Sequence, residues 1–584
     1  MEDINISNIT IRTFGWVQDP GKIENLRKVV EVFDYNSVTH KELRDKIIPK
    51  LVEERDGKSK FINELNNRPL CLKYSDLVGT AFTPRSSARC NGIIQAVIKG
   101  QRRPFISDWP ADNFVRWAHA LGFISYTYET DSFSITNLGL KYTNSEKGSE
   151  EEKEILEYAF LSYPPVVRVL SLLSNGEHLT KFEIGKQLGF VGEDGFTSLP
   201  QDILVMSLAT TEDNKVKNKM KQDWDGSSDK YARMICGWLK KLGWVVQRPK
   251  QVTAKFGLEK YTETITQAYL ITPEGLKALR KGLGINKVSR IPKNVFWEML
   301  STKGIDKKYI RTRRGYIIKI LMNASRLLSA EEIKHKLKSY GFDEDIETIE
   351  DDIKGLVNIG LNIKEESLGY RLHDTINDFV IPSFTTEVTR KSEVLQLKDN
   401  CRKQLRYIPH EYLSLIDISF DGSQNRLFEM QTIDLLINQC GFKGKHLGAQ
   451  RKPDGVVYTD GLKHNYGIII DNKAYSGGYS IPISQADEME RYIRENQTRS
   501  EEVNPNKWWE VFPNDLTDFK FSFISSVFRG NFEDQLKRIS TNTGVNGAAI
   551  NSYNLLLLAE RIKSGQLTLD VTREFFDRNC EIVM

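Results

Sequence analysis

The sequence has little of what several large protein classes require. Its six cysteines are dispersed over 584 residues and form no Cys-x-x-Cys pair, which argues against a zinc ribbon or a disulfide scaffold and favours a reducing compartment. The N-terminus lacks the basic start and apolar core of a signal peptide. No apolar run approaches the ~20 residues needed to cross a bilayer. We therefore expect a soluble, cytoplasmic protein.

Two motifs of nucleotide chemistry are also missing. The chain contains no Gly-x-x-x-x-Gly-Lys-Ser/Thr loop, so an ATP-driven translocase is not expected. It contains no glycine-rich methyl-donor loop beside an Asp-Pro-Pro-Tyr-like segment. The formal net charge of +4 is small for this length, so any basic surface that binds nucleic acid must be local. The length itself predicts roughly three to five domains.

What the chain does contain is a pair of short apolar runs in its C-terminal third. The first, 455–458, directly follows Asp454, and the second, 467–470, runs directly into Asp471. The polar segment between them has the composition of a turn, so we expect two adjacent strands. Alternation along the second strand puts Asp471 and Lys473 on one face, and pairing of the strands would bring Asp454 close to them.

Two carboxylates and one ammonium at a sheet edge suit Mg²⁺, which usually takes one or two protein carboxylates together with water and phosphate. Asp454 and Asp471 would hold one or two Mg²⁺ ions that clamp a scissile phosphate and acidify a bound water. Lys473 would orient or activate that water. The order Pro-Asp, spacer, Asp-x-Lys resembles the PD-(D/E)XK nucleases. The alternative is a surface hairpin that merely carries these charges.

The preceding helix, expected over 426–436, carries a further acidic residue, Glu429. PD-(D/E)XK folds often place an acidic residue on the helix before the catalytic strands. The resemblance therefore implies a supporting role for Glu429 at the site, with ordinary surface charge as the alternative.

The N-terminal two thirds repeat one arrangement three times. In each copy an amphipathic helix ends at a glycine and two short strand-like runs follow, at 114–136, 231–271 and 353–372. The glycine supplies a left-handed C-cap, and the order is typical of the end of a winged helix. Upstream, Thr180 with Glu183 and Ser329 with Glu332 have the spacing of capping boxes. Winged helices insert a helix into the DNA major groove or serve only for protein docking; three copies beside a nuclease motif favour DNA.

Nearly the whole sequence, in order, resembles the FokI family of type IIS restriction endonucleases. The matching runs are 11–18, 116–123, 226–235, 451–455 and 473–479. The resemblance implies a multidomain fold of mainly α winged-helix subdomains followed by an α/β PD-(D/E)XK nuclease domain that reads no sequence. We expect recognition subdomains at 1–150, 151–288 and 289–381, a linker at 382–392, and the nuclease domain at 393–584.

The resemblance also implies a set of base-reading residues in the first two subdomains. Five have the family's residue type, and three (Asp19, Gln222 and Asp225) depart from the family's Asn, Asn and Glu. An Asp at position 19 can only accept hydrogen bonds, whereas Asn also donates. The recognised DNA sequence is therefore expected to be similar to GGATG, with the identity of one or two base pairs undetermined. Arg85 could bind phosphate alone, and Trp109 could be a core anchor. The five that match the family are Gln18, Arg85, Gln101, Trp109 and Lys230.

A helix predicted over 484–492, capped at its start, carries Asp487 and Arg491 four residues apart. The simple interpretation is an exposed intrahelical ion pair, worth about 0.3–0.5 kcal/mol. The resemblance implies instead that both residues reach a second nuclease domain across a two-fold axis, so that each pair forms twice. Transient pairing of two nuclease domains would then cut both strands.

The leading hypothesis is a Mg²⁺-dependent type IIS endonuclease that binds a short asymmetric site and cuts at a fixed distance downstream. A separate methyltransferase would protect the host. One alternative is a sequence-specific DNA-binding protein whose nuclease domain has lapsed, and another is a monomeric nickase. The presence of Asp454, Asp471 and Lys473 argues against the first, and that of Asp487 and Arg491 against the second.

Overall fold

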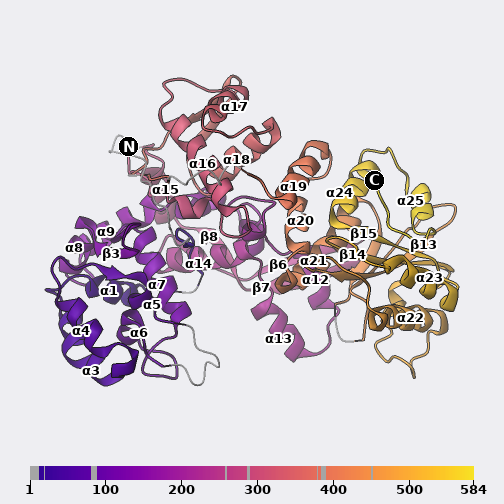
Figure 1. Ribbon diagram of the computed structural model, residues 1–584, viewed down its shortest axis with the longest axis horizontal. Helices are drawn as coiled ribbons and strands as arrows, with labels where there is room; N and C mark the ends of the chain where they lie inside the picture. Colours follow the sequence, from indigo (N-terminus) through magenta and orange to yellow (C-terminus); the bar gives the residue numbers. More distant parts are fainter. Residues whose placement is uncertain are drawn as a thin grey trace.

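The protein is an elongated arrangement of four units (Figure 1). We name them unit 1 (12–145), unit 2 (149–282), unit 3 (290–382) and the C-terminal unit (390–584). Unit 1 and the C-terminal unit lie at opposite ends, unit 2 lies between them, and unit 3 lies above unit 2 in this view. The computed structural model describes residues 12–18, 20–80, 89–256, 259–285, 290–377, 379–382, 390–448 and 451–584.

Unit 1 is mainly helical and carries a small sheet of strand order β1-β3-β2. Its helix α7 (Asp108–Ala120) is followed by Gly122, whose φ of 76° is the left-handed conformation that glycine adopts without strain. The hairpin of β2 (Ile124–Thr127) and β3 (Ser132–Ile135) comes next, so the predicted helix, glycine and hairpin are confirmed. The remaining elements are β1 (Leu72–Lys73), α1 (Ile23–Val32), α2 (Val38–Glu42), α3 (Ile48–Leu51), α4 (Lys58–Asn66), α5 (Tyr74–Val78), α6 (Ile93–Val97) and α8 (Asn137–Asn144).

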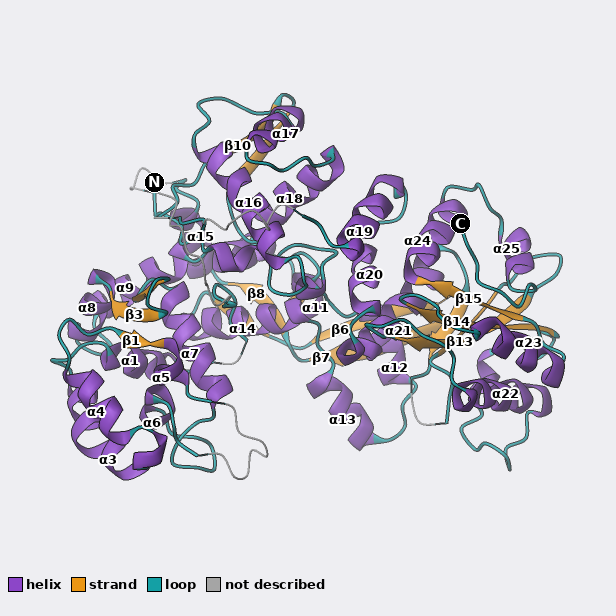
Figure 2. Ribbon diagram, in the orientation of Figure 1, coloured by secondary structure: helices purple, strands orange, loops and turns teal. Residues whose placement is uncertain are grey.

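Unit 2 repeats the arrangement with α14 (Ser227–Lys241), Gly243, β5 (Val245–Gln247) and β8 (Ala268–Ile271), the two strands pairing antiparallel. An additional hairpin, β6 (Lys250–Phe256) with β7 (Glu259–Ile265), interrupts it and lies beside α12 (Figure 2). The capping box of Thr180 with Glu183 is confirmed. The other elements are α9 (Glu150–Ser162), α10 (Pro164–Leu173), β4 (Leu179–Thr180), α11 (Lys181–Gly185), α12 (Gln201–Ala209), α13 (Asn214–Asp223) and α15 (Pro273–Gly282).

Unit 3 is the smallest copy. Its helix α18 (Ile346–Asn358) is followed by Gly360 and by a hairpin of β9 (Ile363–Glu366) and β10 (Gly369–Leu372). The second predicted capping box, Ser329 with Glu332, starts α17 and is confirmed. The other helices are α16 (Lys307–Met322) and α17 (Ala330–Ser339).

The C-terminal unit is an α/β sandwich around a five-stranded mixed sheet of order β11-β12-β13-β14-β15. The first three strands are antiparallel, and β13, β14 and β15 run parallel. Apolar side chains of β13 pack on both sides of the sheet, because alternate residues contribute to two separate cores. The strands are β11 (Lys443–His446), β12 (Gly455–Tyr458), β13 (Tyr466–Lys473), β14 (Asp518–Ser525) and β15 (Gly547–Asn551).

Helices cover both faces of this sheet. One core contains residues of α20, α21 and α24, and the other contains residues of α22 and α23. The multidomain fold with helical N-terminal parts and an α/β C-terminal part is thus confirmed. In the described part of the chain no helix is long and apolar enough to span a membrane. The helices are α19 (Glu393–Gln404), α20 (Ser414–Ser419), α21 (Asn425–Asp434), α22 (Ile483–Thr498), α23 (Phe532–Thr543), α24 (Ser552–Lys563) and α25 (Leu569–Phe575).

Candidate nuclease site and DNA-recognition surface

The three residues predicted to carry the chemistry meet at one end of the C-terminal sheet. Antiparallel pairing places the residue before β12 beside the end of β13. Asp454 accepts a hydrogen bond from the backbone N–H of Asn472, with 2.6 Å between Oδ2 and N. The Lys473 ammonium donates to Asp471, with 2.7 Å between Nζ and Oδ1. The sequence prediction that these side chains converge is correct as geometry.

Burial and repulsion act together on the two carboxyl groups. Asp471 is only 6% exposed. Burial, followed by the charge of Asp471, raises the pKa of Asp454 well above its ordinary value. Burial also raises the pKa of Asp471, against the attraction of Lys473. For Lys473, burial lowers the pKa, but the two carboxylates outweigh it and the net shift is upward. The site therefore gathers more negative charge than one lysine neutralises.

This donor set fits Mg²⁺. Two carboxylates are what that ion commonly takes from a protein, leaving other positions for water and phosphate. The mutual repulsion of Asp454 and Asp471 would be relieved by a cation between them. Across the described ranges, no cluster of three or more His, Cys, Asp or Glu side chains is arranged to hold a metal.

Glu429 lies beside the site, on α21. Its Oε2 is 3.1 Å from Nε2 of His446, the last residue of β11. The His446 side chain is almost fully buried, and its Nδ1 has no hydrogen-bond partner. The negative charge of Glu429 also helps to raise the pKa of Asp454. This position is compatible with the supporting role predicted for Glu429, which stays a prediction.

Sequence reasoning missed three neighbours of the site. His446 and Arg426 flank Glu429, and Glu488 of α22 raises the pKa of Asp471 through its charge. Arg426 lies three residues before Glu429 on α21, a spacing that puts both on one helix face, whereas His446 and Glu488 come from separate segments through strand pairing and helix docking.

In unit 1, the predicted base readers Gln18 and Trp109 are joined through Asn113. The backbone N–H of Gln18 donates to Oδ1 of Asn113 at 3.1 Å, and Nδ2 of Asn113 donates to the carbonyl of Trp109 at 3.0 Å. The indole of Trp109 is 48% exposed. The alternative that Trp109 anchors the core is therefore wrong, because a core anchor would be covered on all sides.

In unit 2, Gln222 is exposed in the last turn of α13. The side chain of Asp225 is only 3% exposed and forms ion pairs with Lys181 and, at 3.5 Å, with Arg233. Its carboxylate is thus already occupied by cations. Reading a base through Asp225 would require the loop between α13 and α14 to rearrange.

The remaining candidates differ in what surrounds them. Gln101 is exposed in the loop after α6, and Lys230 is half-buried in the first turn of α14. Asp19 and Arg85 lie outside the described residues.

The residues predicted to pair across a dimer both lie on α22, but they do not contact each other. Asp487 accepts a hydrogen bond from Arg538 of α23 at 2.6 Å. Arg491 instead pairs with Glu488 at 2.9 Å and with Glu495 at 3.8 Å. The expected intrahelical pair is therefore wrong, since each side chain has a nearer partner. The Asp487 side chain remains 61% exposed and that of Arg491 43%.

The start of α22 also differs from expectation. The helix begins at Ile483, and no side chain caps it. The carbonyl of Pro482 accepts the backbone N–H groups of Gln485 and Ala486, so Ser484 lies inside the first turn instead of at the cap. By contrast, the side chain of Ser392 caps the start of α19 and accepts the backbone N–H of Leu395.

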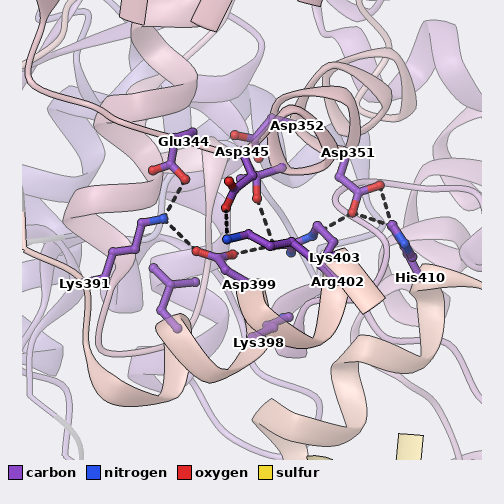
Figure 3. Close-up of polar contacts among 12 residues, drawn as sticks. Glu344, Asp345, Asp351, Asp352, Lys391, Lys398, Asp399, Arg402, Lys403 and His410 are labelled. Carbon is purple, nitrogen blue, oxygen red and sulfur yellow. Dashed lines mark hydrogen bonds and ion pairs between the residues drawn. The ribbon is translucent and has the colours of Figure 1, made fainter. Parts of the chain in front are cut away.

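Ion pairs attach α18 of unit 3 to the start of the C-terminal unit (Figure 3). Oδ2 of Asp351 lies 2.8 Å from Nε of Arg402 and 2.8 Å from Nδ1 of His410. Burial raises the pKa of Asp351, but His410 and Arg402 outweigh it and lower it overall. Further pairs are Lys391 with Glu344 at 2.7 Å and Lys403 with Asp345 at 2.6 Å.

Unit 2 meets the C-terminal unit through apolar side chains. Residues of α12 and of the β6–β7 hairpin belong to the same buried cluster as residues of α21 and the sheet. Figure 1 places α12 directly beside α21. The C-terminal unit is therefore docked against units 2 and 3.

The α/β unit carries two acidic residues and a lysine at the ends of paired strands. It is docked on helical units that have a glutamine and a tryptophan at their surface. Together these features define a nuclease whose recognition and cleavage parts are separate. Models of the FokI family match the chain along most of its length. They are the recognition domain subdomain 1 at 12–145, subdomain 2 at 152–289, the D3 domain at 300–367 and the cleavage domain at 391–583.

The chain belongs to the FokI family: it is a type II restriction endonuclease, a site-specific deoxyribonuclease with recognition and cleavage domains. It is 50% identical to the type II restriction enzyme FokI of Planomicrobium okeanokoites, over 98% of this chain and 99% of that one. It is 32% identical to the type II restriction enzyme StsI of Streptococcus sanguinis, over 98% and 96%.

Solved structures agree with this placement. The structure of restriction endonuclease FokI has a TM-score of 0.92 at 50% identity, and FokI bound to DNA has 0.94 at 49% identity. Each comparison covers 98% of this chain and 100% of the other.

Proposed function

We propose that this enzyme is a Mg²⁺-dependent type IIS endonuclease. It binds a short asymmetric double-stranded DNA site similar to GGATG and hydrolyses both strands at a fixed distance to one side. Recognition would use subdomains at 1–150, 151–288 and 289–381, and cleavage the domain at 393–584, with 382–392 as the linker. The enzyme would act in the cytoplasm, without ATP and without a membrane.

The convergence of Asp454, Asp471 and Lys473 carries this proposal. The two carboxylates would hold Mg²⁺, which when bound supplies positive charge for the scissile phosphate and acidifies a water. The Asn472 amide holds Asp454 in place, and Lys473 orients Asp471. As an ammonium next to the phosphate, Lys473 would also offset the charge that develops in the transition state.

Base reading would use the surface of units 1 and 2. Arginine and lysine suit the O6 and N7 acceptors of guanine, and glutamine suits adenine. The exposed Trp109 and Gln222 support this assignment. The other proposed readers are Gln18, Asp19, Arg85, Gln101, Asp225 and Lys230.

The fixed distance would follow from the separation of the two parts, which places the cut on the order of one helical turn away from the site. One active site cuts one strand, so a second copy of the enzyme would supply the other through Asp487 and Arg491. Their exposed side chains are compatible with that contact. A separate methyltransferase of the same specificity would protect host DNA; a genome neighbourhood that lacks any methyltransferase would count against this.

The test is cleavage of DNA that carries GGATG with random flanks, with both cut ends sequenced and Asp471→Ala run in parallel. Cuts at one displacement that need Mg²⁺ and disappear in the variant are the expected result. Specific binding without cleavage would favour a lapsed nuclease, and cutting of one strand only would favour a nickase. Cleavage of other sites alone would assign Asp19, Gln222 and Asp225 to a changed specificity.

A further inference from the structure

The hydroxyl of Tyr479 is buried in the C-terminal unit without a hydrogen-bond partner. Tyr479 is 3% exposed, and within the described residues no group forms a hydrogen bond with its hydroxyl oxygen. A buried phenol normally has a partner, and the other buried tyrosines of this unit follow that rule. Tyr412 donates to Asp434, Tyr466 to the carbonyl of Leu569 at 2.9 Å, and Tyr492 to the carbonyl of Lys452 at 2.8 Å.

Tyr479 lies on the face of the sheet that carries the proposed nuclease site. Asp471 of β13 is in register with Phe523 of β14, and paired residues of neighbouring strands point to the same face. The ring of Tyr479 packs on that of Phe523, with 6.3 Å between the ring centres. Both belong to one buried cluster with Ile469, which alternation puts on the same face as Asp471. The fold therefore brings the phenol to the side from which Asp471 and Lys473 project.

The position of the Tyr479 ring is fixed from several sides. Its backbone N–H donates to the carbonyl of Val527 at 2.8 Å, and its carbonyl accepts the N–H of Arg529 at 3.0 Å. The half-exposed ring of Tyr475 stacks on it, with 5.4 Å between the ring centres and 11° between the planes. Gly478, whose φ is 85°, allows the chain to turn back between the two rings. The hydroxyl is thus held in place before any ligand arrives.

Negative charges near the phenol keep its proton on. Burial, and then the charge of Asp471, raises the pKa of Tyr479 above its ordinary value, with smaller contributions from Glu488 and Asp454. A phenol that keeps its proton donates a hydrogen bond and cannot act as a base. It is a neutral donor in a site that holds an excess of negative charge.

Each carboxylate near the phenol already accepts a hydrogen bond from another group. A ligand that brings an oxygen atom to Asp471 would therefore meet a donor whose hydrogen bond is not yet made. The phosphate of DNA is such a ligand, because its oxygens accept hydrogen bonds from tyrosine side chains among others. The donors in place are Lys473 for Asp471, the Asn472 amide for Asp454, and Gln485, Arg491 and Tyr492 for Glu488.

We propose that Tyr479 is a further catalytic residue of the nuclease, whose hydroxyl donates a hydrogen bond to a non-bridging oxygen of the scissile phosphate. This inference rests on the proposed function, since the phosphate has to enter beside Asp454, Asp471 and Lys473. Negative charge on that oxygen increases in the transition state, so a donor already aimed at it lowers the barrier. Because the phenol is neutral, it leaves both carboxylates available to a cation.

The first test is Tyr479→Phe, which keeps the ring and its stack and removes only the hydroxyl. Single-turnover cleavage at saturating Mg²⁺ should fall about 10²-fold, the factor for loss of one preorganised donor. The Mg²⁺ concentration that gives half of the maximal rate should not change. Cleavage at the native rate would overturn the proposal. A change in the Mg²⁺ requirement alone would also overturn it, because the hydroxyl would then serve the metal ligands.

The second readout is the unfolding temperature of the metal-free protein, which separates a catalytic hydroxyl from a structural one. In Tyr479→Phe it should be unchanged or higher, because the variant no longer buries a hydroxyl without a partner. The matched control is Tyr466→Phe, on β13 of the same sheet, which removes the bond to Leu569. It should unfold about 2–4 °C lower and cleave at the native rate. An equal decrease in Tyr479→Phe would make its hydroxyl structural and end the proposal.

A third readout does not depend on cleavage. A 3-fluorotyrosine placed at position 479 reports changes around the phenol through its fluorine resonance. With Ca²⁺ in place of Mg²⁺, which also takes oxygen ligands, DNA of a sequence selected by binding should move this resonance. A 3-fluorotyrosine at position 466 is the control and should not respond. A resonance at position 479 that does not move would overturn the proposal.

The two kinds of readout distinguish the possible failures. If the resonance at position 479 moves as expected but the native enzyme cleaves no DNA with Mg²⁺, the proposed function fails and the contact of Tyr479 with DNA stands. If the native enzyme cleaves with Mg²⁺ while Tyr479→Phe cleaves equally fast and the resonance stays in place, the inference about Tyr479 fails alone.

Discussion

The proposed cleavage centre and the proposed recognition surface are built in opposite ways. Asp454, Asp471 and Lys473 come from one hairpin, and the side chains of the last two are largely buried. The proposed base readers come from separate loops and helices of two units, and Trp109 and Gln222 among them point into solvent. A compact site is fixed by strand register, whereas a dispersed one depends on how whole units are placed.

This difference explains where the chain departs from its family. The three proposed catalytic positions keep the order Asp, Asp-x-Lys of the nuclease motif, while the departures that the resemblance implies fall at Asp19, Gln222 and Asp225. A change in a buried carboxylate cluster alters charge, metal binding and folding together. An exposed base reader can change with little effect on folding, which makes the recognition surface the part where specificity can be altered.

The largest expected effect is at the compact site. Asp471→Ala removes one of the two carboxylates and leaves Lys473 without its partner, so cleavage should fall by at least about 10³-fold. Specific DNA binding should stay within a few-fold, because the recognition units are untouched. Cleavage and gel-shift assays on one preparation measure both.

Asp460→Ala is the matched control, since Asp460 lies between the same strands and is exposed beside Lys443. It should cleave within about twofold of the native enzyme. Equal losses in Asp460→Ala and Asp471→Ala would mean that the hairpin acts through its fold and not through the carboxylate.

The compact site was also what the sequence could predict. An uninterrupted β-branched run that ends in Asp-x-Lys sets both the strand and the side-chain direction, because alternation is a local rule. The β6–β7 hairpin is the counterexample. Its alternation at Val252, Ala254 and Phe256 indicates a strand with one buried face, but it cannot say that this face joins a core shared with the C-terminal unit. The contact of Trp224 of unit 2 with Arg426 of the C-terminal unit was unpredictable for the same reason.

The next effect concerns a proposed base reader that also has a structural role. Asp225→Ala leaves Lys181, which is 2% exposed, without its closest carboxylate. An unpaired buried charge costs about 3–5 kcal/mol, so thermal unfolding should begin at a lower temperature. Gln222→Ala, two residues away and exposed, should not change the unfolding temperature. If Asp225→Ala weakens DNA binding while stability is unchanged, Asp225 is a reader and its ion pair contributes little.

A smaller effect is expected at Trp109, which belongs to the exposed part of the recognition surface. Trp109→Ala should weaken cognate binding about tenfold, or ~1.4 kcal/mol, and leave binding to random DNA within twofold. The comparison variant is Tyr35→Ala, another exposed aromatic of unit 1, which should change neither. Equal weakening on cognate and random DNA would assign Trp109 to backbone contact instead of sequence reading.

The smallest effect is a pH dependence of docking between the two regions. Burial, and then the charge of Lys452, lowers the pKa of Lys445 to about 8, and Lys445 lines a cavity that Glu259 of unit 2 also lines. Release of the C-terminal unit exposes Lys445 and returns its pKa towards the ordinary value of about 10.4. The docked state therefore favours the neutral form of Lys445. Below pH 8 the lysine is protonated in both states, so the free-energy cost of burying its charge on docking does not change with pH.

Above pH 8 the buried lysine loses its proton, so the free-energy cost of docking decreases. The docked population should then rise about threefold between pH 8 and 9. The theoretical limit of this rise is about tenfold per pH unit. The expected rise is smaller because the sheet still covers part of Lys445 after release, which keeps its pKa below the ordinary value. Energy transfer between dyes on unit 1 and the C-terminal unit, without metal, measures the docked fraction. Lys445→Met should abolish the dependence. A docked fraction that falls with pH, or that rises equally in Lys445→Met, would show that another group controls docking.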